Sequence, residues 1–187
     1  WDAIGDLPVL SNGEAPEGAQ AYRRAPQSDF QRYARGQSKA IENHAAPRLA
    51  KINLERMKHI PEGGSWRDLP SRLLPAGMKL ARRCDHTKRY GRLKKDGLAS
   101  TILTKCDLHW GAYIHPEQDR VLTVREAARF QAFPDWFVFS GPKTEQYVQV
   151  GNAVPPLLGK RIGESVLLAQ TLGVKPSARS RAPSRLE

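Results

Sequence analysis

The spacing of hydrophobic residues predicts a helix in the first third of the chain. From Ala46 to Ile60, apolar side chains recur at intervals of three and four residues and so share one face. Pro61 and the glycines after it are typical of the end of such a helix. A shorter helix is expected at 68–74. Residues 11–29 are rich in glycine, proline and polar side chains and are expected to form a loop.

Helical patterns return in the C-terminal third. Thr123 and Glu126 stand at the spacing of a capping box, in which the hydroxyl accepts from a helical amide and the carboxylate reaches back to the cap. We expect a short helix there that ends near Pro134. A last helix is expected after Asn152, because apolar residues repeat at every fourth position from 154 to 166.

Two short segments between these helices have the character of strands. They are 101–104 and 112–114, each rich in β-branched or aromatic residues and bounded by polar or glycine positions. The mixture predicts a small, irregular α+β fold. The segment after Gly173 is polar and basic and is expected to be disordered.

The charge of the chain indicates a polyanionic partner. Lysine and arginine number 30 against 19 acidic residues, a net charge of +11 and a sequence pI near 10. The segment 174–187 holds four basic residues and one glutamate, so it explains +3 of this excess. The remaining +8 lies on the rest of the chain, which favours a nucleic-acid contact over a merely basic tail.

The charge is also concentrated. Eight basic residues lie between Arg82 and Lys105 against only Asp85 and Asp96, together with one tyrosine and several hydroxyl side chains. Cations mixed with hydroxyls are suited to holding phosphates and touching base edges. The alternative is a basic hairpin that only meets solvent.

Other chemistry is sparse. The five histidines and two cysteines show no metal-ligand spacing, so we expect no metal site, and lone thiols are typical of reducing intracellular proteins. Each histidine is expected to be structural or solvent-facing. Trp66 and Trp110 are expected to anchor the core or a loop rather than to serve as base-stacking platforms. No apolar run is long enough to cross a membrane, and we expect no membrane partner.

Two stretches carry a family resemblance. Residues 120–135 have the sequence Arg-Val-Leu-Thr-Val-Arg-Glu-Ala-Ala-Arg-Phe-Gln-Ala-Phe-Pro-Asp, and residues 149–156 have the sequence Gln-Val-Gly-Asn-Ala-Val-Pro-Pro. In this order, with Phe-Ser-Gly at 139–141 between them, they resemble the ninth and tenth motifs of cytosine-C5 DNA methyltransferases. Residues 2–8 resemble the segment after the eighth motif, and 90–93 with 101–104 resemble the target recognition domain. The resemblance covers nearly the whole chain to about residue 170.

The resemblance implies a mechanism whose main residues this sequence lacks. In the family, a cysteine thiolate attacks C6 of a flipped cytosine, and a methyl group passes from S-adenosylmethionine to C5. The family's glycine-rich cofactor loop, Pro-Cys nucleophile and Glu-Asn-Val motif are absent, since Cys84 follows Arg83 and Cys106 follows Lys105. We therefore assign no catalytic residue to this chain and expect it to be inactive alone.

The resemblance also implies roles for particular positions. The chain is expected to bind double-stranded DNA, with Arg92 bonded through its guanidinium fork to a guanine or a phosphate. The full set of DNA-contact candidates is Arg89, Tyr90, Arg92, Lys94, Lys95, Thr101 and Thr104. Asn152, Ala153 and Val154, expected at a helix start, are assigned to closing the S-adenosylmethionine pocket, although Asn152 could instead be only an N-cap. Arg125 and Glu126 are assigned a structural role.

The resulting organisation has three parts. Residues 1–118 are expected to form a DNA-binding target recognition domain, and 119–172 a helical segment that carries the ninth and tenth motifs and joins it to the catalytic domain. Residues 173–187 form the basic tail. The helices would pack on a Rossmann-like methyltransferase domain that this chain does not contain.

Three roles are therefore weighed for the chain. It is a fragment or subunit of a DNA (cytosine-5-)-methyltransferase that works with the N-terminal catalytic half, a degenerate DNA-binding remnant, or an RNA-directed relative. The first is favoured, in a bacterial restriction-modification setting, with the protein in the cytoplasm at the nucleoid.

Overall fold

The computed structural model describes residues 1–172. Contacts divide the chain into two units, Trp1–Pro155 and Pro156–Glu187, and the second is described only as far as residue 172. The tail expected at 173–187 lies outside the described residues. The first unit holds all the described elements except the last helix, α5 (Pro156–Thr171).

Regular structure is sparse in the first unit, as the α+β expectation implied. A two-stranded antiparallel sheet pairs β1 (Gln20–Ala21) with β2 (Ala40–Ile41), and Gln20 lies opposite Ile41. Between the strands runs α1 (Asp29–Arg35), whose first turn is capped because Ser28 Oγ accepts from the Gln31 amide at 3.0 Å. The loop expected at 11–29 therefore contains β1.

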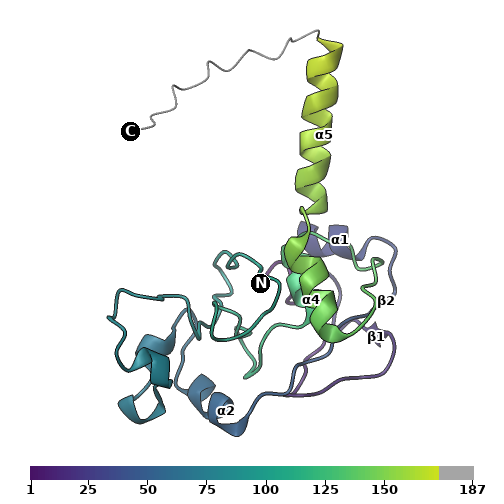
Figure 1. Ribbon diagram of the computed structural model, residues 1–187. Helices are drawn as coiled ribbons and strands as arrows, with labels where there is room; N and C mark the ends of the chain where they lie inside the picture. The colour runs from purple at the N-terminus through teal and green to yellow at the C-terminus, as the bar shows by residue number, and fades with distance from the viewer. Residues whose placement is uncertain (173–187) are drawn as a thin grey trace, which may run out of the picture. The chain divides into compact units, whose positions relative to one another are not determined.

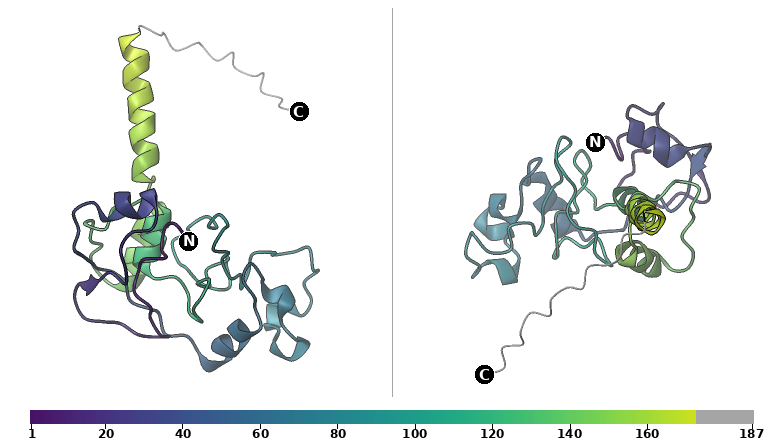
Figure 2. Two further views of the ribbon diagram at one scale, coloured as in Figure 1. Left: turned by 180° about the vertical axis from the view of Figure 1, so that it is seen from behind. Right: turned by 90° about the horizontal axis from the view of Figure 1, so that it is seen from above.

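The first predicted helix is present but shorter than expected. Helix α2 spans Lys51–Lys58. Ala50 before it is in extended backbone, and Pro47 and its neighbours are not part of the helix. The helix expected at 68–74 is replaced by three short 3-10 helices, η1 (Trp66–Asp68), η2 (Ser71–Leu73) and η3 (Ala76–Met78). Prolines at 70 and 75 precede η2 and η3 and interrupt a continuous helix. This blue-green region lies at the end of the first unit opposite α1 (Figures 1 and 2).

The strands expected at 101–104 and 112–114 do not form. Ile114 makes isolated bridges to Arg92 and Val121, and 101–104 is irregular. The aliphatic residues there are instead divided between core and surface, since Ile102 is buried while Leu103 is 40% exposed. Tertiary packing outweighs strand propensity at this position.

The capping box is confirmed and starts α3 (Val124–Phe130). Thr123 Oγ1 accepts from the Glu126 amide at 3.2 Å, and the Thr123 amide donates to the Glu126 carboxylate at 2.7 Å. Helix α3 packs against α4 (Lys143–Asn152), which the sequence pattern did not predict. The last helix is found close to its expected position, as α5.

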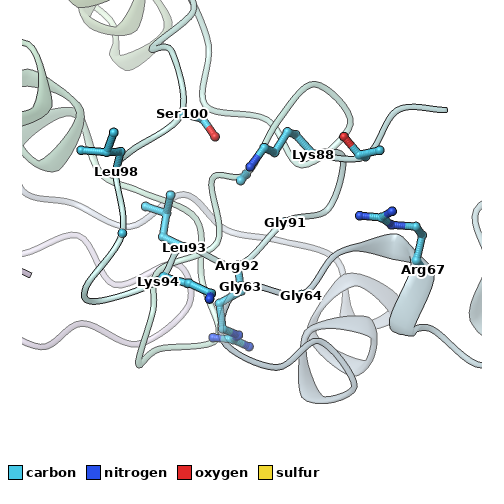
Figure 3. Close-up of a pocket in the computed structure, with 13 residues that line it drawn as sticks. Gly63, Gly64, Arg67, Lys88, Gly91, Arg92, Leu93, Lys94, Leu98 and Ser100 are labelled. Atoms are coloured by element: carbon cyan, nitrogen blue, oxygen red, sulfur yellow. The ribbon is translucent and has the colours of Figure 1, made fainter. Parts of the chain in front are cut away.

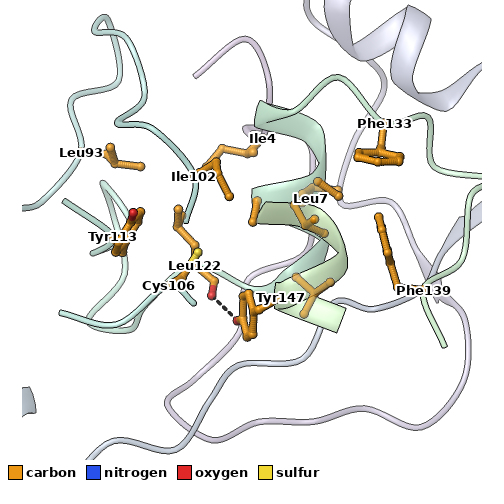
Figure 4. Packing of buried hydrophobic residues seen from close by; sticks show 14 of the residues in the cluster. Ile4, Leu7, Leu93, Ile102, Cys106, Tyr113, Leu122, Phe133, Phe139 and Tyr147 are labelled. Carbon is orange, nitrogen blue, oxygen red and sulfur yellow. Dashed lines mark hydrogen bonds between the residues drawn. The ribbon is translucent and has the colours of Figure 1, made fainter. Parts of the chain in front are cut away.

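The core of the first unit joins distant parts of the chain. Figure 4 shows its larger cluster, in which Ile4, Ile102, Leu122 and Tyr147 pack together, and Tyr147 donates to the Leu122 carbonyl at 2.7 Å. Packing therefore runs continuously across the expected boundary at residue 118. A second cluster, which includes Met57 and other residues at 60–121, supports the region around η1–η3.

Candidate nucleic-acid interface

A hollow with cationic walls opens in the segment where charge is concentrated in the sequence. Its volume is about 440 Å³, and it is shown in Figure 3. We call it the basic hollow. Arg67, Lys88 and Lys94 supply its outer positive charges, and Thr87 and Ser100 supply hydroxyls. In the described part of the chain, no carboxylate lines it, so an anion entering the hollow would meet donors without a competing acid.

Glycines make the hollow possible. Gly63 has φ +75°, and a Cβ there would lie 2.5 Å from Lys94 Cε, so the lysine stem crosses directly over the glycine. A Cβ at Gly91 would lie 2.6 Å from the Ala112 Cβ and 2.8 Å from the Lys88 carbonyl oxygen. A larger residue at Gly91 would push the neighbouring segments apart, whereas one at Gly63 would be strained by the positive φ and would displace the Lys94 side chain.

The structure corrects the position expected for Arg92. Its side chain is 8% exposed, and its guanidinium donates to the carbonyls of Ile60 and Met57, each at 2.8 Å. It also donates to the His115 carbonyl at 2.9 Å and bonds Asp119 at 2.6 Å. These partners engage all three guanidinium nitrogens. Arg92 therefore holds the framework beneath the basic hollow and is not free to read a guanine.

Tyr90 is likewise placed in the interior. It is 1% exposed and belongs to the second core cluster, where its amide donates to the Leu108 carbonyl at 2.7 Å. Burial raises the pKa of its phenol. A buried ring cannot stack on DNA, so this candidate contact is also corrected.

The remaining candidates are accessible. Lys94, Thr101 and Thr104 are exposed, and Arg89 is half-buried. Lys95 is half-buried and forms an ion pair with Glu117 at 2.7 Å, which raises the pKa of Lys95 and lowers that of Glu117. Lys95 is thus partly neutralised, and Lys94 is the stronger candidate of the two.

The DNA-contact candidates drawn from the sequence did not include Lys88, Arg67 or Trp110, although Lys88 belongs to the basic run between 82 and 105. Two more hollows lie beside the basic hollow, and Lys88 lines all three. Trp110 lines both of the additional hollows and is 54% exposed, so it is not a core anchor, whereas Trp66 is buried as expected. Exposure of a large aromatic is not visible in a local sequence pattern.

Buried ion pairs brace the start of α3 behind this face. Arg120 bonds both carboxylate oxygens of Glu126, at 2.8 and 2.7 Å, and all these groups are buried. Glu126 is desolvated, but Arg120 outweighs that effect and holds its pKa well below the usual range. Burial lowers the pKa of His115, whose Nε2 lies 3.7 Å from Glu126, to about 4.

Arg125 and Arg129 tie α3 to distant loops. Arg125 donates to the carbonyls of Glu42 and Phe137, at 2.9 and 2.8 Å. Arg129 bonds Asp135 through two nitrogens, at 3.0 and 2.6 Å, and also pairs with Asp6 at the start of the chain. Such paired buried charges fix one arrangement of the loops, because a mispaired charge would be costly.

The expected cofactor residues are found at the end of a helix. Asn152 is the last residue of α4 and is exposed, so the expectation of a helix start and an N-cap at this residue is wrong. Ala153 is in extended backbone and its amide donates to the Val150 carbonyl at 3.3 Å. The exposed amide of Asn152 can still donate and accept hydrogen bonds, which fits the polar groups of S-adenosylmethionine.

The two cysteines lie in different environments. Cys106 is buried and its pKa is raised to about 12 by desolvation, while Cys84 is an exposed free thiol. Over residues 1–172, no group of three or more histidine, cysteine or acidic side chains could hold a metal ion. Within the same range, no helix has the length and apolar character to span a membrane.

Comparison with known proteins identifies the family. The model of the C-5 cytosine-specific DNA methylase family matches residues 17–167. The chain belongs to this family. DNA (cytosine-5)-methyltransferase 2 of Arabidopsis thaliana is 38% identical over 91% of the chain, and Type II methylase M.HgiDII of Herpetosiphon aurantiacus is 35% identical over 87%.

The chain spans 13% of the plant relative and 47% of the bacterial methylase. A solved structure from E. coli, described as a putative DNA modification methyltransferase encoded within a prophage, matches 91% of the chain with a TM-score of 0.63. That match covers 46% of the solved chain at 21% identity and shows a shared fold.

Proposed function

We propose that this chain is the DNA-recognition and cofactor-closing portion of a DNA (cytosine-5-)-methyltransferase. The complete enzyme would transfer a methyl group from S-adenosylmethionine to C5 of cytosine in duplex DNA. The observation that carries the proposal is the basic hollow, where Arg67, Lys88 and Lys94 face one space without a competing carboxylate. In a methylase-family chain, such a surface is suited to holding the phosphates of a DNA strand.

The division of labour follows from what the described residues supply. Cys106 is buried with its thiol pKa raised to about 12, and neither Cys106 nor the exposed Cys84 stands in a Pro-Cys motif, so we assign catalysis to a catalytic half. Asn152 and the backbone of Ala153 and Val154 would complete the S-adenosylmethionine pocket beside that half. Helix α5, none of whose described residues is buried within its own unit, would pack its apolar stripe on the Rossmann-like domain of the catalytic half.

The setting we propose is bacterial restriction-modification, in the cytoplasm at the nucleoid. The likeness to a type II methylase supports this choice. A non-catalytic DNA-binding remnant is the second candidate, and the absence of a Pro-Cys motif from the sequence favours it as well. Reconstitution with a catalytic half separates the two, because the remnant would not restore methylation of cytosine at C5.

The salt dependence of DNA binding tests the proposal. Each neutralised phosphate contributes about −0.9 to the slope of log affinity against log salt. The double variant Lys88→Ala, Lys94→Ala should therefore flatten the slope by up to about two units. Lys51→Ala, Lys58→Ala, which removes two exposed charges from α2, is the matched control and should change the slope little.

Both variants keep residues 173–187, so nonspecific binding by the tail is the same in each. Equal slopes for the two double variants would show that the basic hollow does not hold DNA. Parallel titrations with duplex RNA test the RNA-directed alternative, which predicts tighter binding to RNA than to DNA of the same sequence.

A further inference from the structure

Trp110 lies in an unusual environment for a surface tryptophan. It is 54% exposed, and its indole offers a large flat apolar face together with one N–H donor. The Arg89 guanidinium lies 5.5 Å from the ring centroid and the Lys105 ammonium 5.4 Å from it. We refer to these three residues as the Trp110 cluster.

Two hollows adjoin the indole. One hollow beside it, of about 520 Å³, is lined by Ser100, Thr101, Leu103 and Tyr113 together with Lys88. The hollow beyond it, of about 360 Å³, is lined by Arg89 and by Thr87 and other residues of the 86–89 segment. Trp110 therefore forms a shared wall between two hollows that also contain cations and hydroxyls.

This combination of groups suits one kind of occupant. An aromatic face stacks on any nucleobase, while nearby cations hold the phosphates that precede and follow that base. The hydroxyls of Ser100 and Thr101 can bond a base edge, and Tyr113, whose hydroxyl donates to the Thr101 carbonyl at 2.8 Å, fixes that segment. A purely electrostatic surface would not require the exposed indole.

We propose that Trp110 stacks on an unpaired base of the bound DNA strand, with Arg89 and Lys105 on the adjacent phosphates. The stacking contact rests on the proposed function and adds to it one specific interaction and a preference among DNA forms. Bases in intact duplex are stacked on each other and do not offer a face, so the contact forms only where a base leaves the stack. The Trp110 cluster thus favours DNA that is locally unpaired.

The test compares two substitutions at one position. Trp110→Leu keeps an apolar side chain but removes the aromatic face, and Trp110→Phe keeps a smaller ring. The control is Trp136→Leu, because Trp136 is 68% exposed and contacts Phe137 rather than a cation. Binding of the full chain is measured by fluorescence anisotropy with a labelled duplex, the same duplex with one mismatched pair, and the single strand.

We expect Trp110→Leu to weaken binding to the mismatched duplex and the single strand by between about 5-fold and 150-fold, the range of one lost stacking contact. Binding to the fully paired duplex should change less than twofold. Trp110→Phe should retain most of the affinity, and Trp136→Leu should behave as the parent chain. Circular dichroism confirms that each variant is folded.

Two results would overturn the inference. One is equal weakening of all three DNA forms by Trp110→Leu, which would indicate a general contact. The other is that Trp110→Leu and Trp136→Leu have the same affinity for each of the three DNA forms while the parent chain still binds DNA in a salt-sensitive way. That result would leave the proposed function intact. Absence of salt-sensitive binding to any DNA by the parent chain would overturn the proposed function as well.

Discussion

Gly151 lies directly against the backbone of Leu103. A Cβ at Gly151 would be 2.5 Å from both the carbonyl carbon and the carbonyl oxygen of Leu103, and 2.5 Å from the Thr104 amide nitrogen. The end of α4, which carries the proposed cofactor residues, therefore contacts the segment that lines the hollow beside Trp110. Only a residue without a side chain permits this approach, because the neighbouring atoms are backbone and cannot rotate away.

Replacement of Gly151 should therefore disturb both regions. We expect Gly151→Ala to lower the free energy of unfolding by about 1–3 kcal/mol, the cost of overpacking, and to weaken DNA binding by displacing residues 103–104. Urea unfolding followed by circular dichroism measures the first effect. Gly77→Ala is the control, since a Cβ at Gly77 meets no atom within 4 Å, and it should change stability by less than about 0.5 kcal/mol. Equal stability of the two variants would contradict the close contact.

The Arg120–Glu126 pair predicts a larger effect on stability. Glu126→Gln leaves a buried guanidinium without its countercharge, so we expect the free energy of unfolding to fall by about 3–5 kcal/mol. Glu145→Gln, at an exposed position on α4, is the control and should have little effect. A Glu126→Gln chain that unfolds at the same urea concentration as the parent would show that the pair is not buried as described.

Stability should decrease as the solution is acidified, because His115 is buried in its neutral form. Its pKa is about 4 in the folded chain against 6.5 for an ordinary histidine, so the unfolded state binds the extra proton first. The stabilisation is complete above about pH 6.5 and is lost as the pH falls toward 4. It amounts to up to about 3 kcal/mol, and the lowered pKa of His44 acts in the same direction.

His115→Asn removes this titration and should flatten the dependence of unfolding free energy on pH between 6.5 and 4. The control is His59→Asn, at an exposed position just after α2, which should leave the dependence unchanged. An identical pH dependence in the His115→Asn chain would show that His115 is not the titrating group.

Asn152 provides a test of the cofactor assignment in the reconstituted enzyme. Asn152→Ala should weaken S-adenosylmethionine binding by about 1–2 kcal/mol, the scale of one lost hydrogen bond, as measured by calorimetry. Because the side chain is exposed at the end of α4, unfolding of the chain should change by less than about 0.5 kcal/mol. Unchanged affinity for S-adenosylmethionine would leave Asn152 without a role in the pocket.

Local patterns in the sequence were sufficient for the features that depend on neighbouring residues. The Thr123–Glu126 capping box and the last helix follow from short-range spacing, and the motifs at 120–135 and 149–156 led to the family that the comparisons show. The excess of positive charge between 82 and 105 also pointed to the region that contains the basic hollow. These features depend on residues close in sequence or on composition.

Tertiary structure alone decided which of those residues face outward. Arg92 and Lys94 stand two positions apart in a basic run. Arg92 is buried and donates to backbone carbonyls at 57, 60 and 115, whereas Lys94 is exposed and its stem lies over Gly63. The sequence could not distinguish them, because the carbonyls that bind Arg92 come from segments distant in the chain. The same reason explains Trp110, whose exposure is set by long-range packing rather than by its neighbours in sequence.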